Sequence, residues 1–345
     1  MRGWFGPFRL ERQVGRGGLG AVWRAVDSRT AATVALKILP PGSDPRAAER
    51  MRREFSELRI IRHPNVVRLL DAGEQDGVPW RAMEFIEGMG VREWLTVAAR
   101  PAPLEPEPEE GAHGSEGVDL DALYDEPDSG ALLAAAKARR LMTLSGLDQE
   151  LEPEKQQELN APGRLVALCK ALAQVCDGLG EIHARGLVHR DVKPGNILVD
   201  SLRKAVLVDF GLLKRVSEQS VSGAGTVVGT YRYMAPEQAR GERVDARADL
   251  YSLGATLYEL LAGRPPFPHT AQLALMEAVV GEMPTDIPTI NPGAPMALCA
   301  LAHRLLAKAP QTRPGDALEV ASMLRAVGKK IEARPTSLPG LEAVR

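Results

Sequence analysis

A cluster of glycines near the start of the chain is suited to binding phosphate. Gly15, Gly17 and Gly20 form a GxGxxG pattern, and Val22 lies two residues beyond it. Without Cβ atoms, the backbone N–H groups of such a loop can come close to phosphate oxygens. A dinucleotide fingerprint would open a helix after the last glycine, whereas here AVWRAVD continues as a strand. The pattern therefore indicates a phosphate site outside a dinucleotide fold, and it needs support from its context.

A lysine and a glutamate are placed to complete this phosphate site. Lys37 lies in VALK on the next expected strand, where its ammonium group would point toward phosphates under the glycine loop. Glu54 lies on the following expected helix, one turn from Met51 and from Leu58, so it borders the apolar face and can turn inward. Glu57 is the competing partner. We favour Glu54 as the residue that pairs with Lys37.

The most specific signal is HRDVKPGN at residues 189–196, followed by DFG at residues 209–211. A match to this many fixed positions is too improbable to arise by chance. The chain resembles the eukaryotic-type (Hanks-type) serine/threonine protein kinases, with the glycine loop, VALK, HRD, DFG and APE at residues 235–237 in the family's order. GRGGLGAVWRAVD and GTYRYMAPEQA are closest in style to bacterial members of that family.

The resemblance implies transfer of the γ-phosphate of ATP to Ser or Thr hydroxyls of proteins. In that reaction Asp191 would accept or orient the proton of the substrate hydroxyl, and Lys193 would contact the γ-phosphate. Asn196 and Asp209 would hold Mg²⁺ or Mn²⁺, since hard oxygen ligands suit these ions better than zinc. Lys37, fixed by its glutamate partner, would grip the α and β phosphates.

Other positions match the parts of the family that bind adenine or support the site. Backbone groups of Glu84 and Ile86 in AMEFIEG would pair with adenine. Asp249 would anchor the catalytic loop, and Arg313 would pair with Glu237. The full expected ATP-binding set is Gly15, Gly17, Gly20, Val22, Ala35, Lys37, Met83, Glu84 and Ile86. The expected structural set is His189, Arg190, Phe210, Gly211, Glu237, Asp249 and Arg313.

The segment between DFG and APE is predicted to regulate the enzyme. Arg190 precedes Asp191, and in kinases with that pairing an arginine pocket often receives a phosphate from this segment. Thr230 matches the residue that supports substrate binding beside Asp191, so it is a poor switch. We expect autophosphorylation of Thr226 or Ser222 to order the loop.

The elements that must position these residues follow from hydrophobic periodicity. Residues 8–39 alternate as three strands, residues 44–63 indicate a helix, and residues 66–70 and 80–86 are strand-like. From residue 164 the spacing of leucines is helical. We therefore predict an α+β, two-lobed kinase domain over residues 8–328, with a small β-rich N-lobe (8–86), a mostly α C-lobe (87–328) and a tail (329–345).

Composition excludes several other classes of protein. The 345 residues are 44% apolar and 26% charged with a net charge of −2, which is typical of a soluble globular protein. Only 4% are aromatic, which disfavours nucleic-acid binding by base stacking. No signal peptide or spanning helix is evident, so a cytoplasmic location is expected. Cys169, Cys176 and Cys299 lack metal or redox spacing and are expected to be buried thiols.

Residues 98–162 are an acidic, proline-rich insertion in the C-lobe, with fifteen Asp or Glu against five Lys or Arg. This composition predicts a disordered or loosely attached segment. It is either a solvated loop or a regulatory segment that contacts a partner or folds back over the basic remainder of the domain. The alternative function is a pseudokinase or nucleotide-binding scaffold that recruits partners through this insertion. A small-molecule kinase is disfavoured by the APE segment.

Overall fold

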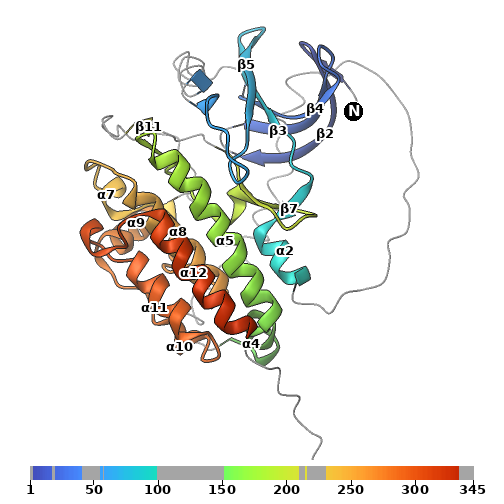
Figure 1. The fold of residues 1–345 in the computed structure, drawn as a ribbon. Coiled ribbons are helices and arrows are strands. Elements are labelled where there is room, and N and C mark those ends of the chain that lie inside the picture. The colour runs from blue at the N-terminus through green and yellow to red at the C-terminus, as the bar shows by residue number, and fades with distance from the viewer. Residues whose placement is uncertain are drawn as a thin grey trace, which may run out of the picture.

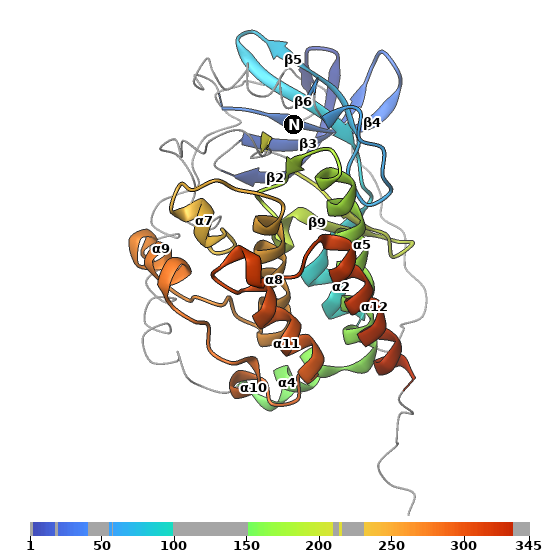
Figure 2. The same ribbon diagram turned by 60° about the vertical axis from the view of Figure 1, so that its left-hand side comes forward.

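The computed structural model describes residues 3–17, 20–40, 55–56, 58–98, 151–209, 214–215 and 231–333. Figure 1 shows a β-sheet above a helical unit, and Figure 2 shows the same two lobes from another side. The upper lobe is an antiparallel sheet of six strands in the order β1-β2-β3-β4-β6-β5. Their bounds are β1 (Gly3–Phe5), β2 (Phe8–Gly17), β3 (Gly20–Asp27), β4 (Ala32–Ile38), β5 (Leu69–Gln75) and β6 (Val78–Glu84).

The two faces of this sheet have different partners because side chains alternate along each strand. Leu36 of β4 and Trp80 of β6 belong to the hydrophobic core of the N-lobe. Met83 of β6 instead packs in the core of the C-lobe, and Ala35, its cross-strand partner, packs against the same core. Lys37 is two residues after Ala35, so the sheet directs it toward the other lobe.

The lower lobe is built around two long helices. Leucines, valine and isoleucine at three- and four-residue spacing bury one side of α5 (Pro162–His183), and α8 (Arg247–Ala262) is buried along almost its whole length. The other helices are α2 (Val91–Ala98), α4 (Pro153–Asn160), α7 (Pro236–Ala239), α9 (Gln272–Gly281), α10 (Ile287–Ile290), α11 (Met296–Leu305) and α12 (Ala317–Glu332). In both figures α12 lies along α5. Gly328 permits this contact, since a Cβ there would lie 3.0 Å from the Cβ of Cys169.

The segments between these helices contain short strands that pair in two small sheets. A three-stranded sheet has the order β10-β9-β7, formed by β7 (Gly88–Gly90), β9 (Ile197–Asp200) and β10 (Ala205–Leu207). A second pair joins β8 (Leu187–Val188) to β11 (Lys214–Arg215). The 3₁₀ turns η2 (Pro194–Asn196) and η3 (Pro310–Thr312) complete the described elements. The predicted α+β, two-lobed architecture is therefore confirmed.

Several element boundaries differ from the predicted ones. The sheet starts earlier than residue 8, because β1 pairs with β2. The strand expected at residues 66–70 begins only at Leu69, and Val66 instead makes an isolated bridge to Leu207. The last helix continues to Glu332, past residue 328. The helix expected over residues 44–63 lies mostly outside the described residues.

The end of the predicted acidic insertion belongs to the folded C-lobe. Leu159 of α4 is buried in the core, and the N–H of Leu151 donates to the carbonyl of Ile290 at 3.2 Å. Asn160 Nδ2 donates to Asn291 Oδ1 at 2.6 Å. The loose attachment predicted for all of residues 98–162 is therefore wrong for residues 151–162. Acidic composition concealed the apolar positions Leu151 and Leu159, which bind this helix to the domain.

The three cysteines are free and buried, as expected. Burial raises the pKa of Cys169 and of Cys299 to about 11, and it raises the pKa of Cys176 further. Thiols with raised pKa values are poor nucleophiles at neutral pH, which agrees with a structural role. Within the described part of the chain, no helix has the length and apolar character needed to span a bilayer.

Candidate active site

Asp249, at the start of α8, holds the backbone of the loop that carries the HRD residues. Its carboxylate is fully buried and accepts the N–H of His189 at 2.8 Å and the N–H of Arg190 at 2.7 Å. His183 Nε2 lies 2.7 Å from the same carboxylate. Burial alone would raise the pKa of Asp249, but the hydrogen bond and charge of His183 outweigh it and hold that pKa below its usual value. Asp249 is therefore an ionised anchor for the loop.

This anchor supports a backbone conformation that side chains rarely adopt. Arg190 has φ +65°, in the left-handed region, and it immediately precedes Asp191. A non-glycine residue there is strained and persists when surrounding contacts determine it. The two hydrogen bonds to Asp249 provide such contacts, and they fix the backbone directly before Asp191.

Asp191 receives two polar neighbours from its own loop. Lys193 Nζ lies 2.9 and 2.8 Å from the two carboxylate oxygens of Asp191. Asn196 Nδ2 donates to the carbonyl and to Oδ2 of Asp191, both at 2.8 Å. Asp191 is buried at 7% exposure. The loop thus brings together three residues that the sequence predicts to take part in phosphoryl transfer.

Asp209 connects this loop to the sheet of the N-lobe. Lys37 Nζ, on β4, lies 2.8 Å from each of its carboxylate oxygens. Arg81 Nη2, on β6, donates to Asp209 Oδ1 at 2.9 Å. Although burial works to raise the pKa of Asp209, attraction to Lys37 and Arg81 prevails and holds that pKa far below its usual range. Asp209 also has φ +62°, in the left-handed region.

The glycine loop continues the same sheet. Val22 of β3 is the cross-strand partner of Lys37, which places the end of the loop beside the lysine. Gly20 has φ +112°, and a Cβ there would lie 2.1 Å from the carbonyl oxygen of Ile38. The third glycine of GxGxxG is therefore required by the turn, whereas a Cβ at Gly15 would meet only Val22 at 3.9 Å.

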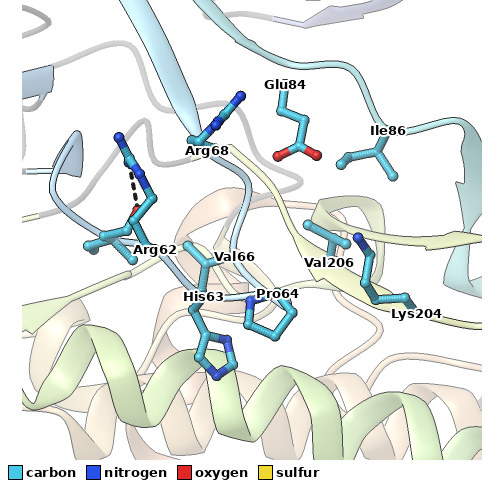
Figure 3. Close-up of a pocket in the computed structure, with 10 residues that line it drawn as sticks. Arg62, His63, Pro64, Val66, Arg68, Glu84, Ile86, Lys204 and Val206 are labelled. Carbon is cyan, nitrogen blue, oxygen red and sulfur yellow. Dashed lines mark hydrogen bonds between the residues drawn. The ribbon is translucent and has the colours of Figure 1, made fainter.

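Met83, Glu84 and Ile86 lie where the two lobes join, at the end of β6 and just beyond it. A cavity of about 310 Å³ lies beside this connection, and the side chains of Glu84 and Ile86 line it (Figure 3). The other residues that line it are Ile61, Arg62, His63, Pro64, Val66, Arg68, Lys204 and Val206. Lys37, Asp191 and Asp209 are not among these lining residues, so this cavity is distinct from the site described above.

The expected scaffold pair in the C-lobe is present. Arg313 Nη1 and Nη2 donate to the two carboxylate oxygens of Glu237 at 2.7 and 2.8 Å, and both side chains are buried. His189 is also fully buried. Six residues with an expected role lie outside the described residues: Glu54, Phe210, Gly211, Ser222, Thr226 and Thr230.

Arg81 and His183 are site residues that the sequence analysis missed. Arg81 is two residues before Met83 on a strand, so it shares a face with Met83 and lies opposite Lys37. An arginine at an inward position of an apolar strand, VPWRAME, is the signal that could have revealed it. His183 lies at the end of α5, where nothing in the local sequence indicates that α8 supplies its partner.

Comparison with known proteins agrees with this geometry. The family model described as protein tyrosine and serine/threonine kinase matches residues 8–319. Serine/threonine-protein kinase PknE of Mycobacterium bovis is 34% identical over 311 residues, which are 90% of this chain and 44% of that protein. PknH of the same organism is 32% identical over 320 residues, which are 92% of this chain and 43% of that protein.

The fold is similar to the crystal structure of the Mycobacterium tuberculosis PknI kinase domain, with a TM-score of 0.58 and 24% identity. That likeness covers 94% of this chain and 97% of the PknI chain. The chain therefore belongs to the protein kinase family, and it resembles the bacterial members. It spans less than half the length of the curated relatives PknE and PknH.

The hydrogen bonds of Asp249 predict that an Asp-to-Asn substitution there destabilises the protein more than the same substitution at an exposed aspartate. In Asp249→Asn an amide nitrogen would face one of the N–H donors that the carboxylate now accepts, so the free energy of unfolding should fall by about 3 kcal/mol. Asp245→Asn is the control, because Asp245 is exposed and an amide oxygen can still accept the N–H of Arg247. Urea unfolding of both variants measures the difference. A loss below about 1 kcal/mol in Asp249→Asn would contradict the anchor.

Proposed function

We propose that this chain is an ATP-dependent protein kinase that phosphorylates Ser and Thr. The observation that carries the proposal is the convergence of two lobes on one site: Lys37 from the sheet meets Asp209 from the C-lobe. The catalytic loop contributes Asp191 with Lys193 and Asn196 in hydrogen-bonding contact. Phosphoryl transfer requires these groups: cations that bind the phosphates, ligands for the metal and a carboxylate that orients the substrate hydroxyl.

The residues present fit the nucleotide and a divalent metal. Asp209 is one-third exposed at its side chain and ionised, and Asn196 turns its amide nitrogen to Asp191, so its amide oxygen is available as a hard donor. These two residues would hold Mg²⁺ or Mn²⁺, which neutralises charge on the phosphates when bound. Lys37 binds the α and β phosphates, with Glu54 as its proposed partner, and Lys193 binds the γ-phosphate.

Asp191 orients the substrate hydroxyl and accepts its proton as the phosphate is transferred. Backbone groups of Glu84 and Ile86 pair with adenine in this proposal. A protein rather than a small molecule is the proposed substrate. The buried Glu237–Arg313 pair supports that choice, because it fixes α7, which carries the APE segment that organises a peptide site in this family.

Transfer of labelled phosphate from ATP tests the proposed activity. With Mg²⁺ and a basic generic protein, the wild type should label itself and the substrate on Ser or Thr. Asp191→Ala and Asp209→Ala should each lose at least about 100-fold in rate, since each removes a group that acts on the reacting phosphate or hydroxyl. Phosphoamino-acid analysis identifies the acceptor. Absence of label in every protein, together with measurable ATP binding, would favour the nucleotide-binding scaffold instead.

Autophosphorylation of Thr226 or Ser222 is proposed as part of the same activity. Arg190, beside Asp191, supplies the cation that a phosphate on the loop would meet. Mass spectrometry of the labelled wild type identifies the modified residues, and Asp191→Ala serves as the unlabelled control. Modification of neither Thr226 nor Ser222 in active protein rules out this switch.

Regulation by the acidic segment is the remaining proposal, through a partner or through contact with the kinase domain. The structure places residues 151–162 in the C-lobe, so the deletion that tests this should remove residues 101–150 and keep α4. Replacing them with a short Gly-Ser linker should raise basal activity by about threefold and reduce its sensitivity to salt, since screening weakens attraction between charged surfaces. Unchanged kinetics would show that the segment is passive.

A further inference from the structure

Arg81 is a buried arginine at the centre of the interface between the lobes. Its side chain is 2% exposed, and it projects from β6 directly opposite Lys37 of β4. Both strands are central in the sheet, and β4 pairs with β6 along the whole segment from Val34 to Ile38. Arg81 lies outside every motif that carries the resemblance to the kinase family.

Two positive side chains thus face each other on neighbouring strands, an arrangement that is unfavourable without a counter-charge. Arginine keeps its charge at any pH that a folded protein tolerates. Burial lowers the pKa of Lys37; Asp209 opposes that effect and Arg81 adds to it. The carboxylate of Asp209 supplies counter-charge to this pair of cations, because it contacts both of them.

The contacts on Asp209 are divided unequally between its oxygens. Oδ1 accepts from Lys37 Nζ at 2.8 Å and from Arg81 Nη2 at 2.9 Å, whereas Oδ2 accepts from Lys37 alone among the described residues. A divalent metal held by Asp209 needs the electron pairs of the same carboxylate. Arg81 reduces their availability and also repels the cation through its own charge.

A purely structural role would not require this residue. The neighbouring inward position on β6 holds Met83, and an apolar side chain at position 81 would pack against the same core without bringing a second charge to Lys37. The hydrogen bond to Asp209 is an effect of the arginine that an apolar side chain could not supply.

We propose that Arg81 is a positioning residue that holds Asp209 against the N-lobe sheet and competes with the divalent metal for its carboxylate. The inference rests on the proposed function, in which Asp209 holds that metal. Arg81 thereby sets how strongly metal and nucleotide assist each other's binding. In the absence of metal, Arg81 adds positive charge near the phosphates. When the metal is bound, Arg81 opposes its coordination by Asp209.

The test is the dissociation constant of a fluorescent ATP analogue, measured with EDTA and with saturating Mg²⁺. The ratio of the two constants reports the metal's contribution. In Arg81→Met this ratio should rise about tenfold over the wild type, because the metal no longer displaces an N–H from Oδ1 and the metal-free complex loses a cation. Arg81→Leu, which is also neutral and lacks a hydrogen-bond donor, should show the same rise and serves if Arg81→Met fails to fold.

Arg12→Met is the matched control, since it removes the same charge from an exposed position on β2 of the N-lobe and should leave the ratio unchanged. Melting temperatures of all four proteins verify folding without nucleotide or metal. A merely structural role for Arg81 would weaken both constants equally, and a ratio within twofold of the wild type in both neutral variants overturns the proposal. A wild-type ratio near one would instead overturn the metal role of Asp209 itself, and this inference with it.

Discussion

The ionic contact between Asp209 and the N-lobe cations is the interaction on which the site depends. Lys37 reaches Asp209 across 172 positions of sequence, and Arg81 reaches it across 128. Neither lobe forms this contact alone, because Lys37 and Arg81 come from the sheet and Asp209 comes from the C-lobe. The free energy of the contact is large only because the cations are buried, where water screens charge poorly. The same contact therefore fixes the relative position of the lobes and places the charged groups of the site.

Asp249 performs the corresponding task within the C-lobe. It lies under the catalytic loop and fixes two successive backbone N–H groups, so Arg190 can adopt a left-handed conformation beside Asp191. Strain in the loop is thus offset by charge-assisted hydrogen bonds from a helix that carries no reacting group. Two carboxylates of the C-lobe thus anchor the site: Asp209 contacts the cations of the sheet, and the buried Asp249 of α8 holds the catalytic loop. Loss of either carboxylate should change the geometry of the site. Loss of Asp249 should do so without removing a group that takes part in the proposed reaction.

Much of this arrangement could be predicted from the sequence, because short motifs carry it. HRDVKPGN, DFG, VALK and APE indicated the family and the two-lobed fold, and the family model confirms that membership. Pairings between distant residues were predictable only where the resemblance to the family supplied both partners, as for Glu237 and Arg313. Arg81 belongs to no motif, and His183 is paired by the packing of α5 on α8, so neither could be predicted from local sequence. The predicted limits of the acidic segment were wrong for another reason: average composition does not reveal two leucines, Leu151 and Leu159, that attach this part of the chain to the core.

Binding of Mn²⁺ to the nucleotide-loaded protein, followed by electron paramagnetic resonance, tests most directly whether Asp209 joins the lobes to a metal site. The account predicts that Asp209→Ala and Asn196→Ala each weaken the protein-dependent Mn²⁺ affinity by at least about tenfold, while Asp245→Asn leaves it unchanged. Folding of each variant is verified by its melting temperature. Mn²⁺ affinity in Asp209→Ala equal to that of the wild type would contradict the account, since the carboxylate that both lobes hold would then have no part in binding the metal.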